Sequence, residues 1–590
     1  MSLKPHPRPA SPGPGREKDP ATTRDASPTP TLHTAPSPRP SPWLAWIASV
    51  RVGSGIVRDV KARAPWYVSD WSDAWNYRVV PATALIFFAN VLPGIAFSLD
   101  LIETTGQYGV AEVLVSSFMA AFVFSVFGAQ PLCIAGVTGP ITVFNQTIYR
   151  IVERQPDAPN YLHFIGWVYL WAAVLHWITA ALNWCNFLKY VTLFSCDTFG
   201  FYVSWVYLQY GVQVLTRQLP SPSRSSSPTT ALDGALVSII LALLMLLTAA
   251  LFRAFARSAL AHRHARRFAA DYGMPLALVA ASALAYWGRF DAAHPATLPV
   301  RGAFEAAGGR AWLVRFWELD GKWVGVALPF GLVLWVLFFF DHNVSSLMAQ
   351  GAEFPLRKPP GFHYDFFLLG ITTFLAGLLG VPAPNGLIPQ APIHTQALVV
   401  LGRPRAHRDD DDDDADVESV RESARGPGPG PAPREVPVAV VEQRVSNLAQ
   451  GALCLVLLTR PFLHVLSLIP RGVLAGLFWY MGCDALLANG ITRKLAHLAR
   501  DRALAPPGEP LARVRASRVA LFVGVQLVGF GAAMAITQTI AAIGFPVVIL
   551  LLIPLRTLVV PRMPFTAEEL AILDGPTASP FTMESVGGAR

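Results

Sequence analysis

Apolar segments of membrane-spanning length recur along almost the whole chain. A spanning helix needs about 20 mostly apolar residues, and fourteen segments have this character. They are residues 81–99, 112–129, 131–149, 161–184, 190–216, 232–252, 268–287, 323–347, 364–381, 385–401, 443–460, 470–489, 517–536 and 540–560. Only 15% of the 590 residues are charged, whereas soluble proteins carry about 25%. We therefore expect an all-α polytopic membrane protein with 14 transmembrane segments, and the composition excludes an ordinary soluble enzyme.

The two ends of the chain differ in composition from the spans. Residues 1–50 are rich in Pro and Ser, which predicts a disordered N-terminal tail. Residues 51–78 combine an amphipathic stretch with several Trp and Tyr residues. This pattern is typical of an interfacial segment at the level of the lipid headgroups. Residues 561–590 are expected to form a C-terminal tail.

The spans form two groups of seven. The first group occupies residues 79–288 and the second residues 323–560, with an exterior loop at 289–322 between them. Within the second group, residues 402–442 contain six consecutive aspartates and then alternating Gly and Pro. A calcium site is conceivable for six aspartates, but such a stretch is typical of a solvated, disordered linker.

Positive charge between the spans predicts their orientation. The connection 253–267 carries five arginines, and the connection 490–518 carries seven Lys or Arg residues. Such connections lie on the cytoplasmic side of membranes. Six of the spans separate the two connections, so both can lie on one side. Both termini are then expected in the cytoplasm. The net charge of +8 follows this topology and does not indicate a nucleic-acid partner.

Motifs of enzymatic chemistry are not found in the sequence. The five cysteines form no CxxC pair, so neither a disulfide framework nor a zinc site is predicted. No P-loop, HExxH or GxSxG motif occurs. We therefore expect no enzyme, no metal and no cofactor. The classes that remain are a transporter and a non-transporting scaffold or receptor.

Two spans are interrupted in the same way. Residues 131–140 and 382–392 each open with proline, continue without helical character and close with a proline where a helix could start. Non-helical backbone at membrane depth is tolerated only inside protein or beside a water-filled cavity. Each segment is therefore predicted to be an extended stretch followed by a half-helix, whose N-terminus attracts anions. The interruptions occur in the third span of each group, which is typical of a transporter site, although prolines that merely kink packed helices are the alternative.

A carboxylate lies deep in the eighth span. Asp341 follows three phenylalanines and precedes His342 and Asn343. Because an aspartate inside a span costs roughly 2.5–3.5 kcal/mol on insertion, we expect Asp341 to face a cavity and to take part in ion or proton handling. A structural role, in which it caps a neighbouring helix, is the alternative. His342, Asn343 and Asn90 of the first span are weaker candidates for lining the same cavity.

Three stretches of the sequence resemble the borate transporters of fungi, which belong to the wider bicarbonate transporter and anion exchanger family. They are WSDAWNYRVVPATALIFFANVLPGIAFS, QPLCIAGVTGPITVFNQT and FFFDHNVSSLMAQGAEFPLRKPPGFHYDFFLLGITTFLAGLLGVPAPNGLIPQAPIHTQAL. The resemblance covers the chain from about residue 55 to residue 555. It implies two inverted repeats of seven spans, with a core (spans 1–4 and 8–11) and a gate (spans 5–7 and 12–14). It also implies half-helices in spans 3 and 10 and a homodimer formed through the gate.

The same resemblance implies a substrate and a site. The family binds anions between the two half-helices, and its acidic residue of span 8 falls on Asp341. Animal anion exchangers have an arginine where this sequence has Gln390, and this difference favours borate over chloride or bicarbonate. The substrate-binding residues are then expected to be Thr138, Gly139, Pro140, Ile141, Asn385, Gln390 and Ala391. We expect an exporter of borate or boric acid in the plasma membrane, with the vacuolar membrane and bicarbonate or other anion exchange as the alternatives.

Overall fold

The structure of the protein is a computed structural model that describes residues 52–219, 228–402, 436–501 and 509–587. The expected N-terminal tail, residues 1–50, lies outside the described residues. So does most of the expected linker at 402–442.

Helices form in the apolar segments. The helices of the first group are α4 (Val79–Thr105), α5 (Val110–Val126), α7 (Tyr161–Ala181), α8 (Leu193–Thr216), α9 (Pro228–Arg257) and α10 (Arg263–Leu284). Those of the second group are α12 (Gly321–Ala349), α13 (Phe362–Leu379), α16 (Val445–Leu457), α18 (Arg471–Ala488), α20 (Ala516–Thr537) and α21 (Phe545–Pro554). Helices are required here because lipid offers no partners to backbone N–H and C=O groups.

Seven helices of the described residues are long and apolar enough to cross a membrane. The number rises to nine if two bent pairs each count as one span. One pair is α16 with α17 (Arg460–Ser467), bent by 83°, and the other is α18 with α19 (Gly490–Ala499), bent by 66°. The protein is thus a helical polytopic membrane protein.

Strands replace helix at both interrupted segments. Strand β1 (Ala135–Gly136) precedes α6 (Gly139–Glu153), and strand β2 (Asn385–Gly386) precedes α14 (Gln390–Ala397). The two strands form an antiparallel pair, with Ala135 opposite Gly386 and Gly136 opposite Asn385. Both helices begin slightly earlier than expected, so the prolines stand second in α6 and third in α14. A proline is still tolerated there, because the first N–H groups of a helix have no partner within it.

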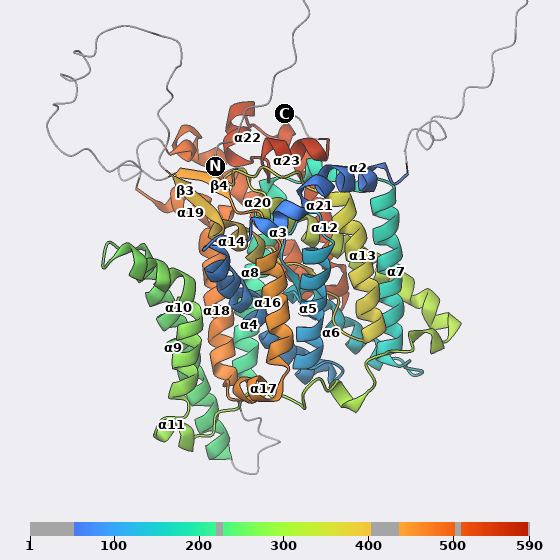
Figure 1. Cartoon of the computed structure of the whole chain (residues 1–590), viewed down its shortest axis with the longest axis vertical. Coiled ribbons are helices and arrows are strands. Elements are labelled where there is room, and N and C mark those ends of the chain that lie inside the picture. The colour runs from blue at the N-terminus through green and yellow to red at the C-terminus, as the bar shows by residue number, and fades with distance from the viewer. Residues whose placement is uncertain (1–51, 220–227, 403–435, 502–508, 588–590) are drawn as a thin grey trace, which may run out of the picture. The chain divides into compact units, whose positions relative to one another are not determined.

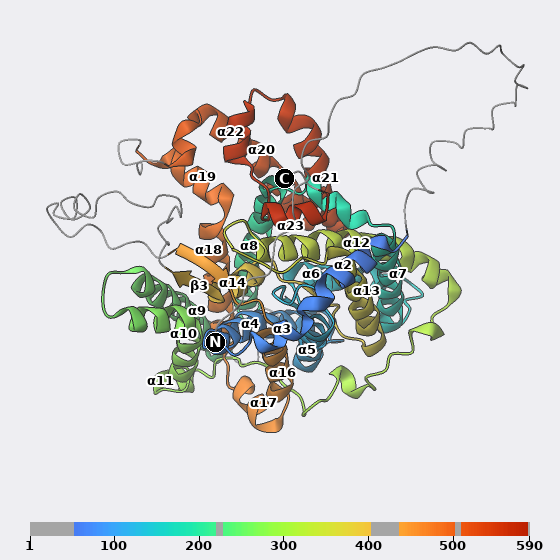
Figure 2. The same ribbon diagram turned by 45° about the horizontal axis from the view of Figure 1, so that its top comes forward.

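Helices from the two halves of the chain pack on one another. Helix α7 contacts α12 and α13, α16 contacts α4 and α5, and α18 contacts α8 and α9. Figures 1 and 2 both show α9, α10 and α11 (Arg289–Ala292) on the side away from α7 and α13. Of the helices that follow the interrupted segments, α6 contacts α4, α7 and α8, and α14 contacts α4 and α12.

The expected linker at 402–442 is shorter than its composition suggests. Residues Val436–Val440 form strand β4, which pairs with β3 (Val399–Gly402). Glu442 follows, and its carboxylate accepts hydrogen bonds from the backbone N–H groups of Arg357 (2.7 Å) and Lys358 (3.2 Å). The linker therefore ends before residue 436, because the valine-rich stretch finds a strand partner that local composition does not reveal.

The C-terminal tail is also structured. It forms α22 (Ala567–Leu573) and α23 (Pro580–Ser585), and Leu573 and Met583 are buried. Asp574 accepts a hydrogen bond from the backbone N–H of Phe194 at 2.8 Å. The tail is therefore docked on the start of α8.

The interfacial segment binds the rest of the protein through its polar side. In α2 (Ser54–Arg63), Asp59 and Arg63 are buried, whereas Val57 and Val60 are 51% and 41% exposed. The Asp59 carboxylate accepts a hydrogen bond from the N–H of His363 at 2.8 Å and so caps the start of α13. The apolar side chains face outward, as a helix in the headgroup region requires.

Candidate functional site

The start of α6 provides the first half of the site. Thr138 is the N-cap residue, and its hydroxyl oxygen accepts from the N–H of Ile141 at 3.5 Å. Gly139 faces Phe97 so closely that a Cβ on this glycine would lie 3.3 Å from the phenylalanine ring. Pro140 and Ile141 are buried. A backbone that approaches an aromatic ring this closely favours glycine at position 139.

The second half of the site is formed by β2 and the start of α14. The side-chain amide of Asn385 donates to the carboxylate of Asp341 at 3.0 Å, and its oxygen accepts from the N–H of Gly386 at 2.8 Å. The amide of Gln390 donates to the carbonyl oxygen of Ala89 at 3.2 Å. Ala391 is fully buried behind it. Two side-chain amides and one carboxylate therefore lie beside the strand pair.

Helix α12 carries Asp341 and lies directly against β2. Asp341 is only 3% exposed. A Cβ on Gly386 would lie 2.8 Å from Cβ of Ser345 and 2.9 Å from Cα of His342. This close approach allows the short side chain of Asp341 to reach Asn385. A carboxylate held by one amide is a group that can bind or release a proton without moving far.

The three weaker candidates have separate contacts. Asn90 lies against β1, and its amide donates to the side-chain oxygen of Gln450 at 3.0 Å. The His342 ring packs 5.0 Å from the ring of Phe124. The amide of Asn343 donates to the carbonyl oxygen of Phe339 at 2.7 Å, within the same helix. Of the three, Asn90 meets the strand pair with its side chain, next to Gly136 of β1, and His342 meets it with its backbone, next to Gly386 of β2.

Two further polar residues on α16, Asn447 and Gln450, join the site, although they were not among the residues predicted from the sequence. The amide of Gln450 donates to the Asn447 oxygen at 3.0 Å, and the amide of Asn447 donates to the carbonyl oxygen of Cys133 at 3.4 Å. With Asn90 they connect α4, α16 and the backbone just before β1. Their signal in the sequence is a pair of side-chain amides three residues apart within a mostly apolar span, a spacing that places both on one helix face.

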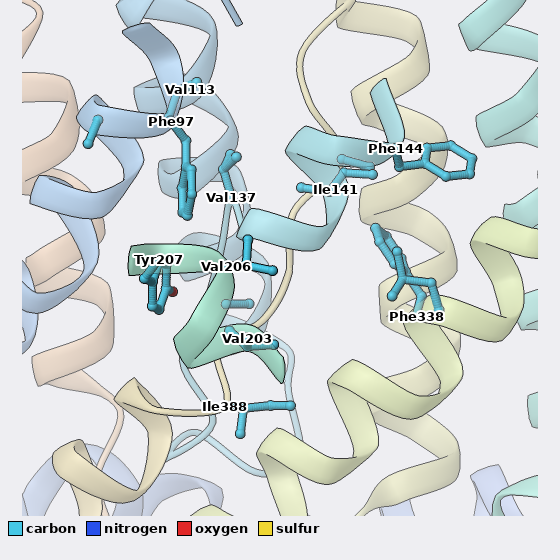
Figure 3. Close-up of a cluster of buried hydrophobic side chains, with 14 of the residues drawn as sticks. Phe97, Val113, Val137, Ile141, Phe144, Val203, Val206, Tyr207, Phe338 and Ile388 are labelled. Carbon is cyan, nitrogen blue, oxygen red and sulfur yellow. The ribbon is translucent and has the colours of Figure 1, made fainter. Parts of the chain in front are cut away.

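Aromatic and aliphatic side chains cover the start of α6 (Figure 3). The ring of Phe97 lies 5.8 Å from that of Tyr207 and 5.2 Å from that of Phe478. The residues that surround the strand pair are buried, so the site is closed off by side chains of α4, α8 and α18.

A cavity of about 370 Å³ approaches this closed site along α6. It is lined by Val143, Gln146, Thr147, Arg150, Ile151, Arg154, Tyr202, Val206, Gln209, Tyr210, Gln213, Arg217, Thr537, Gln538, Thr539 and Ala542. Val206 lies 3.9 Å from where a Cβ on Gly139 would be, so one side chain separates the cavity from the start of α6. Arg150 and Arg154 give the cavity a positive character that suits an anion, whereas Arg217 forms ion pairs with Asp100 and Glu103.

A buried ion cluster supports the segment that leads into β1. Asp70 accepts from Arg444 at 2.9 Å, and the same guanidinium donates to the carbonyl oxygens of Ser125 (2.9 Å) and Gly128 (2.7 Å). The Asp365 carboxylate accepts from the N–H of Ala129 at 2.6 Å. These contacts hold the turn between α5 and β1. No group of three or more His, Cys, Asp or Glu side chains that could hold a metal ion occurs in the described part of the chain.

Nearly the whole described part of the chain matches one known protein family. The family described as the HCO3⁻ transporter integral membrane domain matches residues 51–223 and 217–578. The chain belongs to this family. The resemblance predicted from the sequence is therefore confirmed, and the protein is an integral membrane transporter.

Two relatives support the assignment, and one solved structure shares the fold. A protein of Schizosaccharomyces pombe is 45% identical over 525 residues, covering 88% of this chain and 96% of the relative. Boron transporter 1 of Saccharomyces cerevisiae is 41% identical over 546 residues, covering 91% of this chain and 87% of the relative. The transmembrane domain of the bicarbonate transporter BicA from a cyanobacterium shares the fold, with a TM-score of 0.50 at 15% identity over 80% of this chain and 98% of that one.

Proposed function

We propose that this protein is a secondary active transporter that exports borate and boric acid by alternating access. The observation that carries the proposal is the strand pair β1–β2, from which α6 and α14 start, in a chain 41% identical to Boron transporter 1. Unwound backbone and helix starts beside a buried carboxylate are typical of transporter binding sites.

The proposed architecture has fourteen spans in two inverted repeats of seven, residues 79–288 and 323–560. The pairs β1–α6 and β2–α14 act as the half-helix elements of spans 3 and 10, and the antiparallel pairing of the strands supports an inverted relationship. The core contains spans 1–4 and 8–11, and the gate contains spans 5–7 and 12–14. Movement of the core against the gate then exposes the site to either side. In this proposal the protein forms a homodimer through the gate. It lies in the plasma membrane, with both termini in the cytoplasm.

The chemistry of the substrate fits the groups at the site. Boric acid is a neutral weak acid that becomes borate by taking up hydroxide. Thr138, Asn385 and Gln390 offer hydrogen-bonding side chains, and the backbone at Gly139 offers an N–H group at the start of α6. The N–H groups of Ile141 and Ala391 already donate to the Thr138 hydroxyl and to the carbonyl oxygen of Leu387. Pro140 pre-sets the first turn of α6. Neutral donors of this kind suit a substrate that exists as both an acid and an anion.

Asp341 couples passage of the anion to a proton in this proposal. Its carboxylate accepts the Asn385 amide at 3.0 Å. A proton on Asp341 weakens this hydrogen bond, frees the Asn385 amide for a substrate oxygen and removes the repulsion between carboxylate and borate. Loss of the proton restores the hydrogen bond between Asn385 and Asp341, and the charge of the carboxylate then repels the anion. Asn385 therefore exchanges between Asp341 and the substrate.

Exchange of bicarbonate or another inorganic anion is the second candidate. Two observations favour it: the description of the family names HCO3⁻ transport, and the fold is shared with the bicarbonate transporter BicA. Against it stands Gln390, which provides no fixed positive charge beside the strand pair. The two candidates are separated by flux measurements on the purified protein in liposomes. Brisk chloride–bicarbonate exchange without borate flux would replace the first candidate with the second.

The test of borate export uses intracellular boron. Cells that produce the protein and matched cells that lack it are placed in external boric acid, and boron is measured in both. We expect less intracellular boron in the producing cells, because export opposes passive entry of the neutral acid. Equal boron in both, with the protein present at the cell surface, would contradict export.

A further inference from the structure

A second basic groove lies away from the strand pair, between the start of α4 and the start of α10. It encloses about 690 Å³. Its walls are Tyr77, Arg78, Pro81, Arg263, His264, Arg267, Phe268, Asp271, Tyr272 and Leu401. None of these residues belongs to the proposed borate site or to the cavity along α6.

Arg78 is a buried cation without an anionic partner in this groove. It is 7% exposed, and its guanidinium lies 5.4 Å from the ring centre of Tyr77. No carboxylate of the described residues forms an ion pair with it. Arg63 and Arg444 are buried too, but both pair with Asp70 at 2.9 Å. Because a buried charge without a partner is strongly unfavourable, Arg78 indicates an anion in the groove.

The opposite wall adds to the positive charge. Arg263, His264 and Arg267 belong to the first turns of α10 and are exposed. Asp271 stands four residues after Arg267 on the same helix and offsets one of these charges. Three arginines against one aspartate leave a net positive groove, even with a neutral histidine.

The surroundings of the groove are those of a membrane surface. Trp75 and Tyr77 are 96% and 69% exposed, and Phe268 on the other wall is 55% exposed. Exposed aromatic residues gather at the level of the lipid headgroups. The groove also lies at the start of α10, beside the arginine-rich connection 253–267. This connection is predicted to lie on the cytoplasmic side. Anionic lipids are concentrated in that leaflet.

We propose that this groove binds the phosphate of an anionic phospholipid headgroup, with Arg78 as the buried anchor and Arg263 and Arg267 as the outer contacts. Arginine suits this role because its planar fork binds phosphate oxygens in pairs. Helices α4 and α10 contact each other, so the bound headgroup links the two helices and stabilises the protein. This lipid-binding site does not depend on whether the protein exports borate.

Thermal unfolding of the purified full-length protein in detergent tests this site. The added probes are phosphatidylinositol 4-phosphate, phosphatidylcholine, soluble inositol phosphate and inorganic phosphate. We expect only the phosphoinositide to raise the melting temperature clearly. The double variant Arg263→Gln/Arg267→Gln changes exposed side chains and should lose this rise, and Arg78→Gln should lose it as well.

The matched control is Arg289→Gln/Arg301→Gln, which removes two exposed arginines that follow the C-terminal end of α10 and should keep the rise. An equal rise in the Arg263→Gln/Arg267→Gln variant would overturn the site. An equal rise with soluble phosphate compounds in the wild-type protein would overturn the lipid as its source. No rise with phosphatidylinositol 4-phosphate would overturn the proposal as a whole. If Arg78→Gln fails to fold, the double variant alone decides.

Discussion

Asp341 and Asn385 form the contact on which the proposed coupling depends. Asp341→Asn keeps the size of the side chain but removes its change of charge, so we expect borate flux into acidic medium to fall by at least about tenfold, or ~1.4 kcal/mol. The remaining flux should no longer depend on pH. Both are measured in proteoliposomes at several pH values.

Asp320→Asn is the control for this experiment, because Asp320 precedes the same helix, is exposed and makes no capping hydrogen bond with its side chain. An unchanged rate and pH profile in Asp341→Asn would make the residue structural. If that variant does not insert, borate binding to Gln390→Ala becomes the measurement, and unchanged affinity there would remove the site as proposed.

Asp59 makes folding depend on pH. Burial raises the pKa of its carboxyl from 3.8 to about 7, Asp365 adds to this rise, and the N–H groups of His363 and Tyr364 and the charge of Arg58 oppose it. Between pH 4 and pH 7 the folded protein therefore keeps a proton on Asp59 that the unfolded chain has already lost. The free energy of unfolding should fall as pH rises through this window and level off above it.

Asp59→Asn should remove part of this pH dependence. Melting temperatures at pH 5 and pH 8 should differ less in the variant than in the wild-type protein, and the difference between the two proteins isolates the Asp59 contribution. Asp157→Asn, an exposed carboxylate paired with Lys322, should leave the slope unchanged. Identical slopes for Asp59→Asn and wild type would show that burial of Asp59 does not shift its titration.

At the scale of elements, the strand pair determines how near α12 comes to the site. Gly386→Ala would put a Cβ 2.8 Å from Ser345 and 2.9 Å from the backbone of His342. Since this contact is with backbone and a short side chain, α12 must move away and Asp341 with it. We expect borate flux to fall by at least about tenfold while the protein still reaches the membrane. Gly524→Ala on α20, where a Cβ meets nothing within 4 Å, should transport normally, and normal flux in Gly386→Ala would contradict the close packing.

The ion cluster at Asp70 joins several elements. The carboxylate is fully buried and contacts Arg63 (2.9 Å), Lys358 (2.8 Å) and Arg444 (2.9 Å). Asp70→Asn leaves three cations without their common anion, which should cost about 3–5 kcal/mol in thermal unfolding. Asp73→Asn should cost far less, because Asp73 contacts Lys358 alone in this cluster and is half-exposed. Equal losses in the two variants would contradict the central role of Asp70.

At the scale of the whole molecule, the proposed topology predicts which loops can be labelled from outside. A cysteine introduced as Arg515→Cys in the connection 490–518 should not react with an impermeant reagent on intact cells, because basic connections stay in the cytoplasm. Arg301→Cys in the loop 289–322 should react. Four of the five native cysteines are buried, so the Cys483→Ala variant should show little labelling of its native cysteines. External reaction of Arg515→Cys would reverse the orientation.

Much of the fold could be predicted from the sequence because lipid leaves the backbone few choices. An apolar segment in a membrane must satisfy its own N–H and C=O groups, so runs such as 81–99 and 364–381 become α4 and α13. Pro131 and Pro382 exclude regular helix by the same local reasoning, and Asp341 stands out because charge is rare inside spans. The exposed apolar side of α2 follows from its own periodicity.

Contacts between distant elements were decided by tertiary structure alone. Asn90 meets Gln450 across 360 residues, Asp70 collects three cations from three segments, and β4 emerges from a polar linker to pair with β3. Local sequence carries no trace of these partners, because each depends on which helices pack together and in what register. The same is true of Arg78, which forms no ion pair in the described part of the chain. Its charge is known from the sequence, but its burial beside α10 results from packing.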